Sequence, residues 1–314
     1  MAQHTWVFDA PTGTYKNHAI SGRMYRAAVE DSVFMDHVRP VEGFGRKMGE
    51  NVTLTRVRRL TEPTSAVLSE GVRIPEDSFT LATRTVTPQE LGRSVPFTSL
   101  AEDFSKYDLE NPIQEELRKQ LKLVLDALIA TAFQACQVKY AVTGLASNSI
   151  ATAGTFGATS SANMNTWHLE QIRDYLYDTL FCPPAEGDTF VGIFRTLALR
   201  GIKSDPAWEE WHKYTDPAKK FNSEAGKWED IRLIETNHAN ALGKVGTSSV
   251  LGEGVVFGAE ACVMAEVLTP ELRAAVPADF GRSKAIAWYG NVGFAEVWNT
   301  ANAGEARIIH VGSL

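Results

Sequence analysis

Two β-patterned stretches separated by a long polar segment stand out in the hydrophobic pattern of residues 51–88. In the first stretch Val52 and Leu54 alternate with threonines, and in the second Phe79 and Leu81 alternate with a threonine and an alanine. Alternation with a period of two, in residues enriched in β-branched side chains, is typical of half-buried strands. The pattern therefore predicts a long β-hairpin.

The segment between the two predicted strands is rich in turn-forming residues. It contains a Glu-Pro-Thr-Ser run at 62–65, a Glu-Gly pair at 70–71 and a Pro-Glu-Asp run at 75–77, and has too few apolar residues for a core of its own. Because an isolated hairpin is only marginally stable in water, we expect this one to pack on another surface. That surface lies either on its own chain or on a neighbouring subunit.

A long amphipathic helix is predicted in the stretch ENPIQEELRKQLKLVLDALIATAFQAC. Asn111 suits the N-cap, Pro112 the first helical position and Gln114 the third, as a capping box requires. At 1.5 Å per residue the helix would be a spine about 40 Å long. Apolar positions at three-and-four spacing form its predicted buried stripe: Ile113, Leu117, Leu121, Val124, Leu125, Leu128, Ala132, Phe133 and Cys136.

The N-terminal segment resembles an arm more than a domain. Residues 1–45 carry scattered aromatic side chains, including Trp6 and Phe8, around a short predicted helix over 21–30. The segment is too short to form a core alone. We therefore expect it to lie across other parts of the assembly, where its aromatic side chains are buried.

The second half of the chain alternates predicted helices and strands. Residues 144–163 are biased to small and polar types and are predicted to form a loop. A helix capped by Asn165 or Thr166 follows, with Leu169, Ile172, Leu176 and Leu180 on one face. Short apolar runs at DTFVGIF, IRLIET and three places in the last sixty residues predict strands. The fold class is therefore α+β.

Composition is that of an ordinary globular protein. The 314 residues are 44% hydrophobic and 22% charged, and the net charge of −7 argues against a dedicated nucleic-acid binder while leaving weak contact with DNA open. No secretory signal or run of about 18 apolar residues is present, so we expect a cytosolic protein without a membrane partner. Cys136, Cys182 and Cys262 are scattered and are expected to be buried thiols.

No motif of catalysis, cofactor binding or metal binding was found. The sequence lacks a P-loop, a G-x-S-x-G elbow and an H-E-x-x-H pair, so no cofactor or metal is expected. Glu235 lies three residues before His238 at the end of a predicted strand, where catalytic groups often lie, although a polar turn is favoured.

Two further groups of residues have an ordinary structural interpretation. Acidic residues before the long helix (Glu102, Asp103 and Asp108) are expected to complement its dipole rather than to act as paired acids. The tryptophans of a polar segment (Trp208, Trp211 and Trp228) are expected to pack there rather than to form a sugar or base platform.

The order of these parts resembles the major capsid proteins of tailed bacteriophages, the Hong Kong type capsid fold. The features that carry the resemblance are Gly49 before the hairpin, Gly71 near its tip, and the stretches TVTPQELGRSVPFTS, GIFRTLALRGIKSDPAW, SEAGKWEDIRLIET and VVFGAEACVM. The resemblance covers residues 45–314.

The resemblance implies a fold with an N-terminal arm, an extended hairpin loop, a spine helix, and peripheral and axial domains. Residues 1–45 would be the arm and 46–97 the loop with its base. Residues 98–185 would hold the spine helix and the first part of the peripheral domain, 186–254 the axial domain, and 255–314 the rest of the peripheral domain. In this family the loop lies over an adjacent subunit, which would supply the partner surface.

The resemblance also implies how the subunits are held together. Some members crosslink a lysine of the loop to an asparagine of a neighbour, but no lysine occurs between Lys47 and Lys106 here, and arginine cannot form that bond. We therefore expect a non-covalent shell. The candidate inter-subunit contacts are Arg56, Arg58, Arg59 and Arg84 as salt-bridge donors, with Phe79, Trp6 and Phe8.

The function implied is a coat subunit that self-assembles in many copies into an icosahedral shell around double-stranded DNA, in a virion assembled in the host cytoplasm. Its partners would be further copies of itself, a separate scaffolding protein, a portal and a decoration protein. The scaffolding protein is expected because the arm is much shorter than the cleaved scaffold domain of many relatives. The alternatives are a cargo-enclosing nanocompartment shell of the same fold and a cytosolic enzyme using Glu235 and His238.

Overall fold

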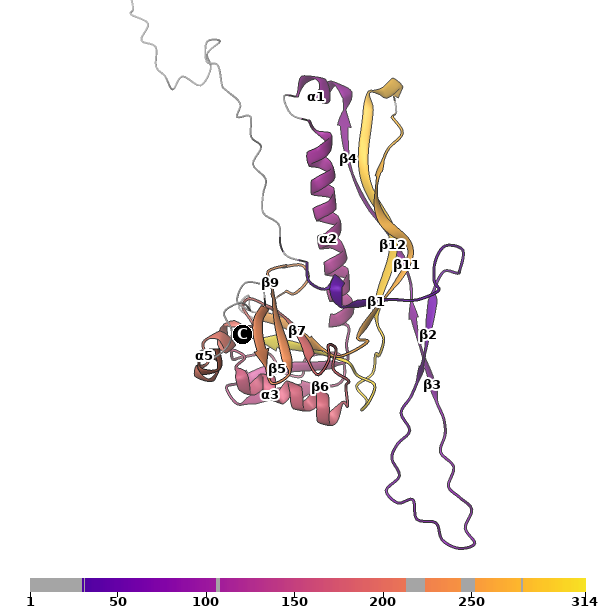
Figure 1. The fold of residues 1–314 in the computed structure, drawn as a ribbon, viewed down its shortest axis with the longest axis vertical. Helices are drawn as coiled ribbons and strands as arrows, with labels where there is room; N and C mark the ends of the chain where they lie inside the picture. The colour runs from indigo at the N-terminus through magenta and orange to yellow at the C-terminus, as the bar shows by residue number, and fades with distance from the viewer. Residues whose placement is uncertain (1–29, 31, 106–107, 213–223, 244–251, 278) are drawn as a thin grey trace, which may run out of the picture.

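The computed structural model describes residues 30, 32–105, 108–212, 224–243, 252–277 and 279–314. The molecule is elongated and has three parts (Figure 1). A compact body lies beside the lower end of a long helix, a four-stranded sheet runs along that helix, and a two-stranded hairpin projects away from both.

The helices and strands follow the predicted order. The helices are α1 (Ser99–Phe104), α2 (Glu110–Gln134), α3 (Thr166–Asp174), α4 (Arg200–Lys203) and α5 (Pro206–His212), with short helical turns at Met35–His37, Tyr175–Thr179 and Asp279–Gly281. The strands are β1 (Val38–Pro40), β2 (Val52–Val57), β3 (Leu81–Val86), β4 (Gln89–Thr98), β5 (Val138–Gly144), β6 (Ser147–Ala151), β7 (Phe190–Arg195), β8 (Glu224–Trp228), β9 (Ile231–Thr236), β10 (Gly252–Phe257), β11 (Cys262–Ala274), β12 (Ser283–Glu296) and β13 (Ile308–Ser313).

The body is built on a mixed seven-stranded sheet in the order β6-β5-β13-β10-β7-β9-β8. Successive residues of β10 point to opposite faces, because Val256 belongs to a core with Leu169 and Ile172 of α3, whereas Val255 and Phe257 belong to the core that covers the other face. That second core contains the C-terminal half of α2. The sheet is thus buried on both sides, which explains why its strands read as continuous apolar runs.

The N-terminal half of α2 packs on the second sheet, whose order is β1-β11-β12-β4. Leu117 is buried with Ile286 and Trp288 of β12, and the Trp288 indole Nε1 donates to Gln120 Oε1 at 3.1 Å. One helix therefore belongs to two cores, which is why its apolar stripe runs along nearly its whole length. The predicted spine is confirmed, and so is the α+β class.

Three sequence predictions about local structure need correction. Asn111 is not the N-cap of α2, because the helix begins earlier and the Asp108 carboxylate accepts from Glu110 N at 3.1 Å. Residues 144–163 are not a loop throughout, because β6 pairs with β5 in a hairpin. The buried face of α2 also includes Asp126 and Ile129, which lie outside the predicted stripe.

Other expectations agree with the structure or fall outside the described residues. Asn165 caps α3 by accepting from His168 N at 3.3 Å, and Leu169, Ile172, Leu176 and Leu180 are all buried. The three cysteines are buried and free. The predicted helix over 21–30 and the arm residues Trp6 and Phe8 lie outside the described residues, as does the side chain of Trp211.

The sheets divide the chain differently from the expected domain limits. Residues 186–254 supply β7, β8, β9 and the start of β10, but β5, β6 and β13 complete the same sheet from outside that range. A sheet shares its backbone hydrogen bonds across all its strands, so the body is one unit. No helix within the described residues has both the length and the apolar character needed to cross a membrane.

Candidate assembly surfaces

The predicted hairpin is formed by β2 and β3, which pair in antiparallel register from Val52 opposite Val86 to Val57 opposite Leu81. Val52 and Val86 are buried with Val263 and Ala295 of the neighbouring sheet. The hairpin is thus partly supported by its own chain, one of the two alternatives that the sequence left open.

The structure decides which face of the second arm is turned inward. Ala82, Arg84 and Val86 face the four-stranded sheet, whereas Leu81 is exposed, and Phe79 is exposed and precedes the strand. The predicted alternation is present in β3. Which of its alternate residues face inward is set by the pairing with β2, in which Arg56 lies opposite Ala82.

Arg56 is buried at the root of the hairpin. Its Nη1 donates to Val297 O at 2.8 Å and to Asn299 Oδ1 at 3.0 Å, its Nη2 donates to Thr83 O at 3.0 Å, and its guanidinium lies 5.0 Å from the Trp298 ring centroid. Five donors in a planar fork suit this kind of multiple contact. Arg56 therefore fastens β2 to the segment that follows β12.

The other three candidate arginines also have partners on their own chain. Arg84 Nη2 lies 3.5 Å from Glu296 Oε1, Arg58 Nε lies 3.9 Å from Glu305 Oε1, and the Arg59 guanidinium lies 4.6 Å from the Phe181 ring centroid. The described contacts of all four arginines thus hold the base of the loop. Their role toward a neighbouring subunit stays a prediction, as does that of Phe79.

Glu296 is the most unusual group at the hairpin root, because it is 2% exposed on β12. Burial raises its pKa to about 7, although the cations of Arg84, Lys139 and Arg56 oppose the shift. Folding therefore favours the protonated carboxyl. The stabilisation is complete below the ordinary pKa of 4.5 and is lost as the pH rises through about 7.

We expect Glu296→Gln to stabilise the chain at pH 8 by roughly 1–3 kcal/mol, because the amide removes the cost of a buried ionised carboxylate. At pH 4 the two proteins are expected to be nearly equal. Urea unfolding at pH 4, 6 and 8 measures both. Glu102→Gln, at an exposed ion pair with Lys284, is the matched control and is expected to change stability by less than about 0.5 kcal/mol. A less stable Glu296→Gln at pH 8 would show that the ion pair outweighs the burial cost.

Beyond the root, residues 58–80 form a long exposed loop at one end of the molecule (Figure 1). The hairpin and its loop present exposed apolar side chains at Val57, Leu60, Val67, Leu68, Val72, Ile74, Phe79 and Leu81. Val67 is 89% exposed. Monomeric proteins rarely expose so many apolar side chains in one region, so the loop is a candidate contact surface.

A smaller apolar group lies at the opposite end of the long axis (Figure 1). Leu100 and Phe104 of α1 are exposed there, and so are Val276 and Phe280 at the tip of the β11–β12 hairpin. Asp279 and Phe280 both have positive φ, an uncommon conformation for residues other than glycine. The tip backbone thus holds an aromatic side chain in solvent.

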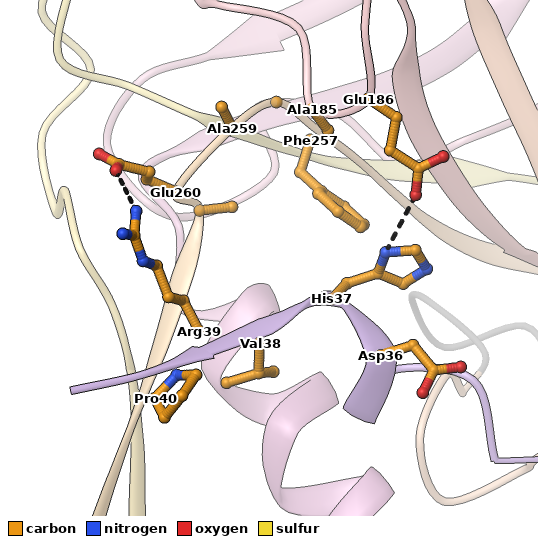
Figure 2. Close-up of a pocket in the computed structure, with 12 residues that line it drawn as sticks. Asp36, His37, Val38, Arg39, Pro40, Ala185, Glu186, Phe257, Ala259 and Glu260 are labelled. Carbon is orange, nitrogen blue, oxygen red and sulfur yellow. Dashed lines mark hydrogen bonds and ion pairs between the residues drawn. The ribbon is translucent and has the colours of Figure 1, made fainter. Parts of the chain in front are cut away.

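The segment before β1 crosses the body at the shallow depression shown in Figure 2. Arg39 Nη1 lies 2.6 Å from Glu260 Oε1, and the His37 ring lies 5.3 Å from the Phe257 ring in an edge-to-face arrangement. Burial lowers the pKa of His37, against the opposing effect of Glu186 4.0 Å away. These contacts hold the start of the described chain on the body.

Asp126 is the buried centre of that attachment and has no exposed surface. Its Oδ1 accepts from Val33 N at 3.0 Å and from Phe34 N at 2.9 Å, and its Oδ2 lies 2.9 Å from His238 Nδ1. Phe34 is also fully buried, with its ring 5.7 Å from that of Phe133. One carboxylate on α2 thus joins the N-terminal segment to the loop after β9. Sequence reasoning missed it, although an acidic residue among apolar helix positions was a usable signal.

The pair proposed for an enzyme is not brought together. Glu235 Oε2 lies 2.5 Å from Lys203 Nζ and is partly exposed, whereas His238 is buried against Asp126. Each side chain therefore already has a structural partner. The described residues also contain no group of His, Cys, Asp and Glu suited to hold a metal ion.

Some of the residues given a structural interpretation have partners on their own chain, and the effect of the acidic group on the helix dipole stays a prediction. Glu102 pairs with Lys284 at 2.8 Å, and Asp108 Oδ1 accepts from Glu110 N at 3.1 Å just before α2. The rings of Trp208 and Trp228 pack at 6.1 Å.

A second buried polar group lies where α2 ends. His310 Nε2 lies 2.8 Å from Glu253 Oε1, and His310 Nδ1 lies 2.9 Å from Lys139 Nζ, which donates to Gln134 O at 2.5 Å. Burial lowers the pKa of His310, opposed by Glu253. These contacts tie β13, β10 and β5 to the end of the spine.

Comparison with solved structures identifies the fold. The chain is similar to the head structure of Helicobacter pylori bacteriophage KHP40, with a TM-score of 0.73, 12% identity and 99% of each chain covered. It is also similar to the capsid of cyanophage Pam1, with a TM-score of 0.69, 14% identity and coverage of 100% of this chain and 99% of that one. This chain has a phage capsid fold.

The capsid of Ralstonia phage GP4 gives the same result, with a TM-score of 0.65, 14% identity and 98% of each chain covered. The capsid fold predicted from the order of parts is therefore confirmed over nearly the whole chain. No family model and no curated protein matches the sequence. At 12–14% identity the shared feature is the fold, which the two sheets, the spine helix and the projecting loop make up.

Proposed function

We propose that this chain is a phage major capsid protein, which assembles in many copies into an icosahedral shell around double-stranded DNA. The proposal rests on the capsid fold and above all on the projecting loop. The loop carries a row of exposed apolar side chains that the described part of the chain leaves uncovered.

A neighbouring subunit would cover these side chains. Burial of apolar surface contributes about 25 cal/mol per Å², and a standard interface buries about 1,600 Å² in total. A subunit in a closed shell makes several such contacts at once, so the shell is held by multivalency even where each contact is weak.

The finer parts of the proposal rest on the sequence and on its resemblance to the capsid family. The shell is non-covalent because the loop carries no lysine, and the arm lies along another subunit. The axial part is the body to which the predicted axial residues 186–254 contribute β7, β8, β9 and the start of β10, and the α2 sheet is the peripheral part. The partners are a separate scaffolding protein, a portal and a decoration protein, with weak non-specific contact to packaged DNA in keeping with the net charge of −7. Assembly takes place in the host cytoplasm.

The test is to express the chain alone and with a candidate scaffold, and to measure mass and shape by sedimentation and negative-stain microscopy. We expect closed particles of many subunits, which dissociate completely on boiling in detergent. A stable monomer or small oligomer under every condition would contradict the proposal. A ladder of covalent oligomers would contradict its non-covalent part alone, and particles filled with a protein cargo in place of DNA would favour a nanocompartment.

A further inference from the structure

The root of the hairpin gathers more cations than carboxylates. The pairing of β2 with β3 places Arg56 and Arg84 on the same face, two positions apart across the hairpin. Burial lowers the pKa of Arg56, and the neighbouring Arg84 cation lowers it further. The charged groups that act on Arg56 are Arg84, Arg58, Glu305 and Glu296, so three arginines share the root with two carboxylates. One positive charge thus stays unbalanced even when both carboxylates are ionised, although buried charges in proteins are normally paired.

Three polar atoms at the root are buried without a partner. Arg56 Nε, Arg84 Nε and Glu296 Oε2 make no hydrogen bond to any described residue. Arg56 is 6% exposed and Glu296 is 2% exposed, so bulk solvent does not reach them freely. The 3.5 Å contact of Arg84 Nη2 with Glu296 Oε1 uses the other atoms of the same two groups. Buried polar groups are normally satisfied by protein, by an ordered water or by an ion.

We propose that the hairpin root binds one small monovalent anion, with Arg56 Nε and Arg84 Nε as its donors. The two guanidinium groups attract the anion, and the anion balances the excess of positive charge around them. Both Nε atoms are covered by protein, which excludes a carboxylate side chain of another subunit and limits the ligand to about the size of a water molecule. The Arg84 side chain is 30% exposed and gives such an ion a way in from solvent. The ligand class is therefore a halide ion, and chloride is the ordinary case.

A single water molecule is the other ligand that fits the unpaired atoms. Water accepts two hydrogen bonds and donates two, so it suits the two Nε donors together with an ionised Glu296. When Glu296 is protonated, its proton lies on Oε2, because Oε1 faces the Arg84 donor. Oε2 is then a third donor, which an anion can accept and a water with two lone pairs cannot.

Anion binding is therefore coupled to the protonation of Glu296. Burial raises the pKa of this carboxyl to about 7, so the protonated form predominates in acid and the ionised form above neutral pH. Ionisation replaces the third donor by a negative charge that repels the anion. We expect tight binding at pH 5.5 and weak binding at pH 8.0.

The other titratable groups around the site come from every element packed on it. They are Arg84 on β3, Arg56 on β2, Arg58 after β2, Glu305 before β13, Lys139 on β5 with His310 beside it, Cys262 on β11 and Cys136 at the end of α2. Burial raises the pKa of each cysteine to about 12, which keeps both thiols neutral over this range. A variant of Glu296 itself separates its titration from that of His310.

Unfolding in different salts tests the site in the full-length, unassembled subunit. Urea unfolding is measured at pH 5.5 and 8.0 in mixtures of sodium chloride and sodium isethionate at one ionic strength, so that the screening of surface charges is constant. Isethionate is monovalent and too bulky for the site. At pH 5.5 we expect the unfolding equilibrium constant to fall tenfold for each tenfold increase in chloride above the dissociation constant, and at pH 8.0 we expect a weaker dependence. The site lies within one subunit, so its failure is distinguishable from that of the proposed function.

Three variants assign the effect to the root. Arg84→Gln is expected to lose the chloride dependence. Glu296→Gln has an amide donor at every pH and is expected to keep the dependence at both pH values. Arg282→Gln removes an exposed arginine near the tip of the β11–β12 hairpin and is the matched control, which is expected to behave as the unaltered chain does.

Bromide in place of chloride locates the ion without any variant. We expect its anomalous diffraction peak between Arg56 Nε and Arg84 Nε in crystals of the unaltered chain grown at pH 5.5. Equal unfolding in chloride and isethionate at pH 5.5 would overturn the proposal and leave a buried water as the partner of the unpaired atoms. A chloride dependence that Arg84→Gln retains, or crystals without a bromide peak at the root, would also overturn it.

Discussion

Deleting residues 61–78 is expected to abolish closed particles while the isolated subunit stays folded. The deletion removes most of the exposed apolar side chains of the loop and leaves β2, β3 and all four root arginines in place. Residues 58–60 and 79–80 then connect the strands in a five-residue turn, a common length for a hairpin. The subunit loses little buried surface of its own, because residues 61–78 are exposed throughout.

Sedimentation and negative-stain microscopy measure particle formation, and circular dichroism with a thermal melt measures folding. A full-length chain with Val67, Leu68, Val72 and Ile74 changed to serine is the matched control for loop length, and we expect it to lose particles as well, because apolar burial provides the contact energy. Closed particles from the deleted chain would contradict the role of the loop. Closed particles from the serine variant alone would assign that role to the loop backbone or its charges.

Asp126→Ala is expected to lower the free energy of unfolding by about 3–5 kcal/mol, a large fraction of the stability of an ordinary domain. The change leaves the amides of Val33 and Phe34 and the ring of His238 without their acceptor in a place that solvent does not reach. Buried donors that lose their partner cost about 1–3 kcal/mol each. We expect the N-terminal segment to detach first, since Asp126 accepts two of its backbone hydrogen bonds.

Urea unfolding measures the loss of stability, and hydrogen exchange at residues 33–34 and 238–242 locates it. Asp126→Asn keeps one carbonyl acceptor for the two amides and is expected to lose less than the alanine variant. Asp178→Ala, at an exposed carboxylate, is the matched control and is expected to change stability by less than about 0.5 kcal/mol. Equal effects of Asp126→Ala and Asp178→Ala would show that the buried carboxylate does not hold the segment.

The elements with a strong local pattern were predictable. The spine helix, the helix capped by Asn165 and the alternating strands were predicted correctly because the spacing of apolar residues differs between helices and strands. The start of α2 was misplaced because Asn111 is a good capping residue, whereas the helix begins at Glu110 and its N-cap residue Leu109 makes no side-chain capping bond. The β6 strand was missed because its small and polar composition resembles that of a loop.

The contacts of the candidate residues were not predictable. An alternating strand does not say which of its faces is buried until its partner strand sets the register, and so the exposure of Phe79 and Leu81 was not predictable from the pattern. The positive charge of the root arginines predicted that they would have polar partners. It did not predict which ones, because those partners are distant in the chain.

What the sequence by itself determined is therefore the order and type of the elements, together with the absence of lysine from the loop. Tertiary structure alone decided that Arg56 meets Val297, 241 positions away, and that Asp126 meets His238, 112 positions away. The physical reason is that helix and strand periods are local properties of neighbouring residues. Buried polar contacts depend on which distant segments are packed together, and a single sequence does not record that.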